Sequence, residues 1–446
     1  MTTPIVDFVR AYAAKGGVRL HMPGHKGKPQ LGCEPLDITE ISGADVLYHE
    51  TGVIAESEQN ATALFGSAAT LYSSEGATLA IKAMLATVAM TLPRGEKLRV
   101  LAARNAHKAF LYGAALLDAE VQWLYPKAAS HVCACEVTAE DVEKALSAAA
   151  KKPHAVYLTS PDYLGNVADI SEISAVCKRH GVPLLVDNAH GAYLRFLSPS
   201  RHPLALGATM CADSAHKTLP VLTGGAYLHI AKSAPEGFLE RARDALSLFA
   251  STSPSYLILQ SLDACNATLE NGYAEALSNT VARLSGLCEV LRVHGFAVRV
   301  SEPLKIVIEA PAVGYTGEAL ADILRENGIE PEFADRDFLV LMCTPQNGEE
   351  ELLHLASVLC SIPLGMPLER EALPALCPKT ACSVREAMLA PAEVVSVAEA
   401  RGRICATPLV ACPPAVPVVV AGEIIDDAVL LHLAHYGIDR IAVVKE

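Results

Sequence analysis

Lys217 follows a serine and a histidine in the segment DSAHKT, and Asp187 ends the apolar run PLLVD about thirty residues earlier. A lysine amine can form a Schiff base with an aldehyde, and a carboxylate can keep a pyridine nitrogen protonated. The two residue types at this spacing therefore predict a pyridoxal 5'-phosphate enzyme. The alternatives for each residue alone are a solvated surface lysine and an aspartate that caps a helix.

A phosphate-binding segment is expected at SSEGAT, Ser73–Thr78, because a helical pattern follows it directly. Backbone N–H groups and the dipole at the start of a helix attract an anion. Serine and glycine also begin helices that bind nothing. Ser214 and His216 could add side-chain donors, and His107 in RNAHK could lie over a cofactor ring.

Strand and helix patterns alternate along the part of the chain that carries these residues. The expected elements are a helix at 76–92, a strand at 98–108 with a polar exit, a strand at 154–163, a helix at 170–182 and a strand at 183–190. Continuous apolar strands are typical of parallel sheets with helices on both faces. Ligands of such sheets bind beyond the carboxyl ends of the strands. We therefore predict an α/β fold in which SPDY, DNAH and SAHK meet in one pocket.

The rest of the chain suggests additional domains. A helical pattern from about 255 to 292 predicts a long connector, and FAVRV, LKIVIEA, EALADILRENG and FLVLMCTP predict a small α+β domain. The proline-rich tail is expected to be an irregular docking segment. The predicted division is an N-terminal segment at 1–60, a large domain at 61–290, the small domain at 291–365 and a C-terminal domain at 366–446.

Composition and charge narrow the classes of partner. The chain has 446 residues, of which 51% are hydrophobic, and a formal net charge of −14. This charge argues against nucleic acid and anionic membranes, because its field repels phosphates. The chain begins without a signal-peptide pattern, and no apolar window is long enough to span a bilayer. We expect a soluble cytoplasmic protein.

The thirteen cysteines are odd in number and lack CxxC spacing, which is typical of thiols in a reducing compartment. Cys133 and Cys135 in HVCAC, with one nearby histidine, are too few ligands for a typical metal site. No metal is expected.

Several motifs, in a fixed order along the sequence, resemble those of a known family. HMPGHKG (21–27), DITEISGADVLYHETGVI (37–54), RNAHK, SPDYLG, DNAHGAY and SAHKTL resemble the major domain of the Orn/Lys/Arg decarboxylases. GIEPEFAD, VREAMLAP and the stretch from RGRICA to AGEII resemble the small and C-terminal parts of the same family. The resemblance extends nearly end to end, and it implies a large domain of fold type I, the aspartate aminotransferase-like fold of pyridoxal phosphate enzymes.

The resemblance implies roles for the residues around the cofactor ring. Lys217 would hold the aldehyde, Asp187 would pair with the pyridine nitrogen, His107 would stack on the ring and His190 would sit beside it. His216 would join Lys217, Asp187 and His107 among the catalytic residues.

The resemblance also implies contacts with the phosphate and the substrate. The phosphate would be held by residues at the start of the first helix of the large domain and near the lysine, namely Glu75, Gly76, Ala77, Ser214 and His216. Glu332 and His25 would lie on the substrate side. A carboxylate there suits a distal cation, since opposite charges in a secluded pocket attract strongly.

The implied activity is decarboxylation of arginine, lysine or ornithine to carbon dioxide and a polyamine or diamine. The chain resembles the short form of the family, without an N-terminal wing domain, for which a homodimer with a shared active site is expected and a higher oligomer stays open. It departs from the family where SSEGAT replaces NGST or NGTT, and where CPPA and AGE replace YPPG and PGE.

Two other functions remain open from the sequence. An aminotransferase or carbon–sulfur lyase of the same fold would use Lys217 and Asp187 in the same way, with Arg299 or Arg336 as candidate ligands of the α-carboxylate in an aminotransferase. A non-catalytic pyridoxal-binding or regulatory protein would keep the fold with an altered substrate side, because a fold does not fix a function.

Overall fold

A computed structural model describes the chain except for residues 50, 127–130, 135, 370–372, 409–414 and 446. The chain divides into two compact units. The first comprises residues 1–100, 146–158 and 170–274, and the second comprises residues 101–145, 159–169 and 275–446. Cys135 and most of the CPPA segment lie outside the described residues.

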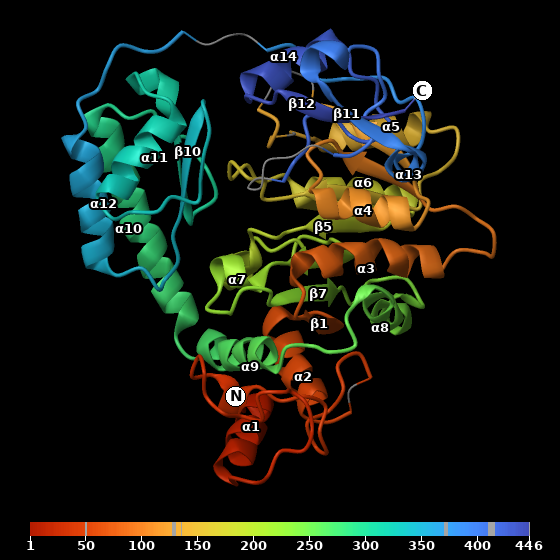
Figure 1. The fold of residues 1–446 in the computed structure, drawn as a ribbon, viewed down its shortest axis with the longest axis vertical. Coiled ribbons are helices and arrows are strands. Elements are labelled where there is room, and N and C mark those ends of the chain that lie inside the picture. Colours follow the sequence, from red (N-terminus) through yellow and green to blue (C-terminus); the bar gives the residue numbers. More distant parts are fainter. Residues whose placement is uncertain (50, 127–130, 135, 370–372, 409–414, 446) are drawn as a thin grey trace. The chain divides into compact units, whose positions relative to one another are not determined.

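A seven-stranded sheet with the order β1-β7-β6-β5-β4-β2-β3 forms the central layer (Figure 1). Its strands are β1 Ala69–Ser73, β2 Arg99–Ala103, β3 Glu120–Leu124, β4 Ala155–Thr159, β5 Leu184–Asp187, β6 Met210–Asp213 and β7 Ala226–Ile230. β5 and β6 are parallel, with Asp187 opposite Ala212. β7 runs antiparallel to both β6 and β1. The predicted α/β class with a mainly parallel sheet is confirmed.

Helices alternate with these strands. They are α1 Pro4–Ala14, α2 Val53–Phe65, α3 Gly76–Met90, α4 Lys108–Leu116, α5 Ala139–Ala148, α6 Ile170–His180, α7 Ala215–Thr218 and α8 Phe238–Phe249. α3 contains no charged residue except Lys82, and it packs on β6 and β7 as well as on α8 (Figure 1). The burial of this helix on several sides explains its nearly uniform apolar sequence.

The expected long helical connector is two helices. α9 spans Tyr256–Glu270 and α10 spans Tyr273–His294. Gly272 lies between them with a φ of +83°, a left-handed conformation that glycine adopts without steric cost. The apolar periodicity continues across this turn, so the sequence pattern predicts a helical connector without showing the break.

The segment after α10 forms a three-stranded antiparallel sheet in the order β8-β10-β9. Its elements are β8 Lys305–Glu309, α11 Gly317–Glu326, β9 Phe333–Ala334, β10 Phe338–Met342 and α12 Glu349–Ser361. β8 and β10 lie in the segments LKIVIEA and FLVLMCTP. In FAVRV, Val298 makes an isolated bridge to Ile308.

The C-terminal tail is more regular than the sequence predicts. It contains α13 Val384–Leu389, β11 Ala392–Ser396, α14 Asp427–His435 and β12 Arg440–Val444, and β11 pairs with β12 in an antiparallel sheet. Short 3₁₀ helices lie elsewhere at Glu34–Leu36, Ala192–Phe196, Ala310–Val313 and Val397–Glu399. The expectation of an irregular tail is therefore wrong for these elements. β11 is largely exposed, so its sequence lacks the alternation of a half-buried strand.

A buried ion pair fixes the C-terminal part within the second unit. The Arg104 guanidinium donates through Nε to Glu423 Oε1 at 3.2 Å and through Nη2 to Glu423 Oε2 at 2.8 Å. The same guanidinium donates to the carbonyls of Pro417 and Val418. The AGE segment, which departs from the family pattern in its first residue, thus keeps the glutamate that makes this pair.

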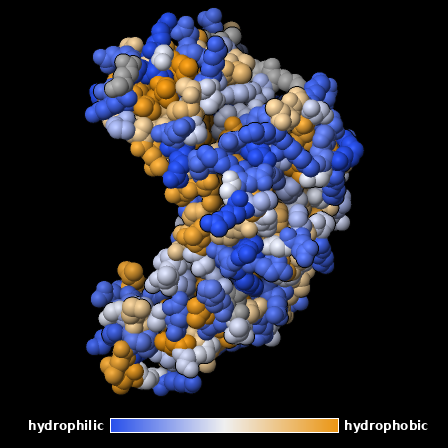
Figure 2. Space-filling view, turned by 90° about the vertical axis from the view of Figure 1, so that its right-hand side faces the viewer, coloured by the Kyte–Doolittle hydropathy of each residue, from blue (hydrophilic) through white to orange (hydrophobic). Residues whose placement is uncertain are grey.

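The N-terminal segment presents apolar side chains to solvent. Val18, Leu20 and Leu31 are each 89% exposed, and Met22 is 62% exposed. Figure 2 shows hydrophobic side chains at its lower end, where Figure 1 places the N-terminal segment. Among the described residues, no helix is both long and apolar enough to cross a membrane.

Candidate active site

Lys217 lies in the short helix α7, which begins directly after β6 and Ser214. Its Nζ is 2.9 Å from Nε2 of His190. A protonated amine only donates, so His190 Nε2 is the acceptor whenever Lys217 is charged. The amine is thus directed at a histidine that follows β5.

Asp187, the last residue of β5, is almost completely buried. Its Oδ2 accepts from the Tyr157 hydroxyl at 3.1 Å, and its Oδ1 accepts from the Ala189 N–H at 3.1 Å. Burial raises the pKa of Asp187, while the positive charge of Lys217 and these two hydrogen bonds oppose the rise. A bound cation would stabilise the ionised carboxylate further.

The expectation that DNAH and SAHK meet is therefore confirmed. β5 and β6 are parallel neighbours, so their carboxyl ends lie at the same edge of the sheet. This edge brings together Asp187, His190 and Lys217, whose charges and hydrogen bonds are coupled. SPDY, residues 160–163, follows β4 and belongs to the second unit.

The start of α3 provides backbone donors in the first unit. Gly76 has a φ of +71°, and its N–H donates to the Gly224 carbonyl at 2.7 Å. The first N–H groups of a helix have no intrahelical acceptor, so Ala77 contributes a donor that can face an anion. Glu75 precedes the helix and accepts from the Ser251 N–H at 2.7 Å, a contact that gives its carboxylate a structural role.

Ser214 and His216 differ as phosphate ligands. Ser214 is the N-cap of α7, and its hydroxyl makes no capping hydrogen bond. His216 Nδ1 is 3.0 Å from the Gly225 carbonyl, so Nδ1 carries the proton and Nε2 of the neutral ring is an acceptor. Burial lowers the pKa of His216, and the charge of Lys217 lowers it further. His216 therefore offers an anion a donor from Nε2 only when the ring is protonated.

Two predicted site residues belong to the second unit. His107 is the N-cap of α4, and its Nδ1 accepts from the Ala109 N–H at 3.1 Å. Glu332 directly precedes β9, and its Oε1 accepts from the Tyr163 hydroxyl at 2.5 Å. The roles of His107 and Glu332 toward the cofactor and substrate stay predictions.

His25, the remaining predicted substrate residue, lies in the N-terminal segment. Its Nε2 is 3.2 Å from Asp37 Oδ2, and its Nδ1 accepts from the Gly27 N–H at 3.0 Å. Both ring nitrogens are thus engaged within the motif HMPGHKG and the segment that follows it. A substrate contact of His25 stays a prediction.

Asp213 has no predicted role, yet this buried residue accepts hydrogen bonds from four side chains close to the lysine. Its Oδ2 accepts from His202 Nε2 at 3.0 Å and from His229 Nε2 at 3.1 Å. Its Oδ1 accepts from the Asn188 amide at 2.7 Å and from the Cys211 thiol at 3.2 Å. Asp213 thereby connects the end of β6 to the residue that directly follows Asp187.

We expect Asp213→Asn to destabilise the protein by about 3 kcal/mol, because the buried imidazoles lose the anion that accepts from them. Burial raises the pKa of Asp213, but the facing imidazoles of His202 and His229 outweigh this and hold it far below its usual value. The stabilisation is therefore complete above about pH 4, the usual range of an aspartate, and is lost as the pH falls toward the folded-state pKa.

Urea unfolding curves at pH 7 and below pH 4 measure this difference. Asp322→Asn is the matched control, because Asp322 is 70% exposed and pairs with Arg325 on the surface; we expect it to change the free energy of unfolding by less than about 0.5 kcal/mol. An Asp213→Asn protein as stable as wild type at pH 7 would contradict the assigned role of the carboxylate.

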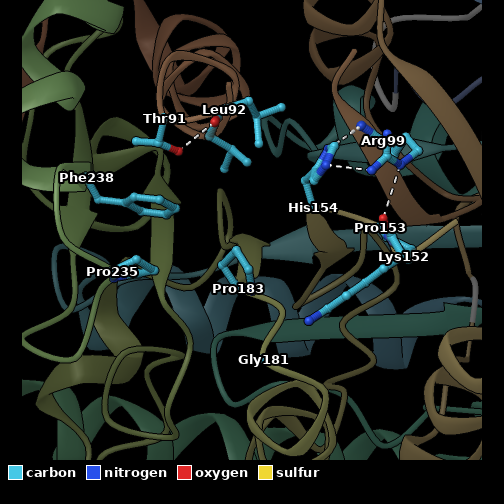
Figure 3. Close-up of a pocket in the computed structure, with 11 residues that line it drawn as sticks. Thr91, Leu92, Arg99, Lys152, Pro153, His154, Gly181, Pro183, Pro235 and Phe238 are labelled. Carbon is cyan, nitrogen blue, oxygen red and sulfur yellow. Dashed lines mark hydrogen bonds between the residues drawn. The ribbon is translucent and has the colours of Figure 1, made fainter. Parts of the chain in front are cut away.

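A pocket of about 320 Å³ lies in the first unit, near the amino end of β5 (Figure 3). Pro183, one of its lining residues, directly precedes β5, so the pocket is at the amino end of the strand that Asp187 terminates. Arg99 and His154 are hydrogen-bonded to each other in its wall. Its lining contains no predicted site residue within the described chain, and it is separate from the lysine site.

The mainly parallel sheet, with a lysine and an aspartate at its carboxyl edge, is consistent with the predicted fold type I architecture. Residues 3–288 match the family described as Orn/Lys/Arg decarboxylase, major domain, and residues 368–436 match the C-terminal domain of the same family. The chain therefore belongs to the Orn/Lys/Arg decarboxylase family and is, as predicted, a carboxy-lyase.

Relatives cover almost the whole chain. An arginine decarboxylase of Halalkalibacterium halodurans is 29% identical over 97% of this chain and 92% of its own. The uncharacterized protein YaaO of Bacillus subtilis is 32% identical over 95% of this chain and 92% of its own. The crystal structure of the lysine decarboxylase LdcF of Francisella novicida superposes with a TM-score of 0.83 at 18% identity, covering 99% of this chain and 81% of the other, which confirms the predicted fold.

Proposed function

We propose that this chain is a pyridoxal 5'-phosphate-dependent decarboxylase of a basic L-amino acid, with carbon dioxide and a diamine or polyamine as products. The observation that carries the proposal is the amine of Lys217 beside buried Asp187 at the shared carboxyl edge of β5 and β6. Membership of the family and the arginine and lysine decarboxylases among the similar proteins support the class of substrate.

The donor and acceptor groups of the first unit fit pyridoxal phosphate. The edge provides an amine for the aldehyde, a buried carboxylate for the ring nitrogen, and backbone and hydroxyl donors for the phosphate. Gly225 allows close packing there, since a Cβ on it would lie 2.3 Å from the Val221 side chain. When bound, the cofactor supplies a pyridinium ring that accepts the electron pair left when carbon dioxide departs.

We assign Lys217 to the covalent attachment of the cofactor and Asp187 to the ring nitrogen. Asp187 is held by Tyr157 and the Ala189 N–H, so it meets a cation without reorganising. His190 Nε2 accepts a hydrogen bond from Lys217 Nζ and is positioned to take up a proton that this amine releases. Ala77 and Ser214 are the stronger candidates for phosphate, with Gly76 and Glu75 shaping the turn and His216 contributing when protonated.

The remaining assignments rest on the resemblance. We assign His107 to stacking on the ring, and Glu332 and His25 to the substrate. Glu332 would receive the distal cation, because a carboxylate and a cation attract strongly where water is excluded. The homodimer, the cytoplasmic location and the four-part division of the chain stay predictions, and the exposed apolar side chains of the N-terminal segment are a natural surface for a partner subunit.

The test is carbon dioxide release by the pyridoxal phosphate-loaded protein. We expect release from at least one of arginine, lysine and ornithine, without an added keto acid, and at least about a hundredfold less from leucine or methionine, because an ionic contact in a dry pocket is lost. A requirement for a keto acid would instead indicate the aminotransferase alternative. No turnover of any cationic amino acid would contradict the proposal.

Among the residues that the structure describes, neither candidate arginine supports the aminotransferase alternative. Arg299 Nη1 is 3.5 Å from Glu309 Oε1, and its guanidinium lies over the Phe338 ring at 5.4 Å. Arg299 is thus already engaged within the small sheet. Arg336 lies in the exposed turn between β9 and β10.

A further inference from the structure

The Tyr163 hydroxyl makes a hydrogen bond to one oxygen of the Glu332 carboxylate, the group that we assign to binding the distal cation of the substrate. The hydroxyl donates to Glu332 Oε1 at 2.5 Å, although 169 residues separate the two in the sequence. Glu332 is half-buried. Within the described residues, the structure gives Glu332 Oε2 no hydrogen-bond partner, so the two oxygens of this carboxylate are not equivalent.

The Tyr163 ring is fixed in this position. It is 8% exposed and packs edge-on against Phe333, with ring centroids 5.3 Å apart. The ammonium of Lys305 lies 5.7 Å from the ring centroid. A phenol held between an aromatic ring and a cation has little freedom to turn away from Glu332, and the cation polarises the ring so that its O–H becomes a better donor.

Lys305 itself is held by buried groups. Its side chain is fully buried, and Nζ donates to the Asp162 carbonyl at 3.1 Å and lies 3.5 Å from Glu302 Oε1. Because leaving a buried charge without its partners is costly, Lys305 is retained beneath the ring. Within the second unit, Glu302 pairs with Lys305, Lys305 lies over the Tyr163 ring, and Tyr163 donates to Glu332.

We propose that Tyr163 is a specificity-determining residue that makes Glu332 select an ammonium group over a guanidinium group. This inference rests on the proposed function, in which Glu332 receives the distal cation of the substrate. An ammonium is a point charge and pairs well with one carboxylate oxygen. A guanidinium pairs best through two parallel hydrogen bonds to both oxygens. The short hydrogen bond from Tyr163 competes for one of these oxygens and penalises the two-oxygen contact.

The test is the ratio of kcat/KM for arginine to that for lysine in the loaded enzyme. Tyr163→Phe keeps the ring and removes the hydroxyl, so we expect this ratio to rise about tenfold, which corresponds to about 1.4 kcal/mol. The value for lysine should change less than about threefold, since its single contact is retained. A ratio that stays within about twofold, or that falls, overturns the proposal.

Tyr125→Phe is the matched control in the same unit. The Tyr125 hydroxyl also donates to a glutamate, Glu423 Oε1, at 3.2 Å, but that glutamate is paired with Arg104. We expect the control to leave the ratio unchanged. An equal shift in both variants would reveal a general structural effect and overturn the proposal.

A binding measurement separates this inference from the proposed function. Wild-type protein that releases no carbon dioxide from any cationic amino acid contradicts the proposed function. Calorimetric titration of the loaded wild-type and Tyr163→Phe proteins with lysine and with arginine then still measures selectivity. We expect the ratio of the two dissociation constants to move toward arginine in the variant, and an unchanged ratio, or absence of binding by both amino acids, overturns the inference.

Discussion

Lys217→Ala is expected to abolish the visible absorbance of the bound cofactor and to lower carbon dioxide release by at least about a thousandfold. Lys217 Nζ is the amine at the carboxyl edge of β6, beside His190 and the buried carboxylate of Asp187. Its removal deletes both the covalent attachment and the positive charge that helps to keep Asp187 ionised. Absorbance spectra after addition of pyridoxal phosphate and removal of the excess measure the first effect.

Lys217→Arg separates the covalent role of the lysine from its charge. A guanidinium retains the positive charge near Asp187 but does not serve as the attachment amine at neutral pH, because it stays protonated. We expect this variant to fold like wild type and to remain colourless. A bound chromophore that survives in both variants would exclude Lys217 as the attachment site, whereas a colourless wild-type protein would contradict the cofactor assignment itself.

The sequence predicts the part of the site that depends on strand ends. Asp187 ends one continuous apolar strand and Lys217 follows another, and parallel strands bring their carboxyl ends to one edge whatever the details of packing. The same reasoning locates the start of α3, since a turn of small residues precedes an apolar helical run. These inferences use local sequence and one topological rule.

Contacts between distant segments could not be predicted in the same way. Asp213 is shared by His202 and His229, which come from a loop and from β7, and this pairing depends on the register of β6 with β7. Tyr163 and Glu332 meet only because the turn after β4 packs beside β9 in one apolar cluster. Asp213 and Tyr163 are not part of a repeating apolar pattern. The sequence therefore does not indicate which distant residues they contact.

The tail illustrates a different limit. Prolines around residues 413–417 favour an irregular interpretation, yet Val429, Leu433, Ile441 and Val443 form a buried cluster. Helix α14 and strand β12 each supply two of these side chains at the proper period, four residues in the helix and two in the strand. The spacing of these apolar residues was therefore a usable signal for the helix and the strand, but the proline-rich composition favoured an irregular interpretation.

Asp187→Asn is expected to leave the cofactor bound and to lower kcat by about a thousandfold, or about 4 kcal/mol of transition-state stabilisation. An amide is nearly isosteric, so the hydrogen bond from Tyr157 to the side chain can persist. It carries no charge, however, and no longer favours the protonated pyridine that accepts the electron pair. The loss should fall mainly on kcat, because that charge interaction strengthens as the reaction proceeds.

Tyr157→Phe is the control that tests whether the charge or the hydrogen bond matters. It removes the hydroxyl that donates to Asp187 Oδ2 but retains the carboxylate and the N–H of Ala189 as its donor. Since one hydrogen bond to a charged group contributes about 1.5–3 kcal/mol, we expect a smaller loss than with Asp187→Asn. Near-normal turnover of Asp187→Asn would refute the ring-nitrogen assignment. Equal losses in both variants would place the effect in the geometry of the carboxylate rather than in its charge, because only the asparagine variant removes the charge.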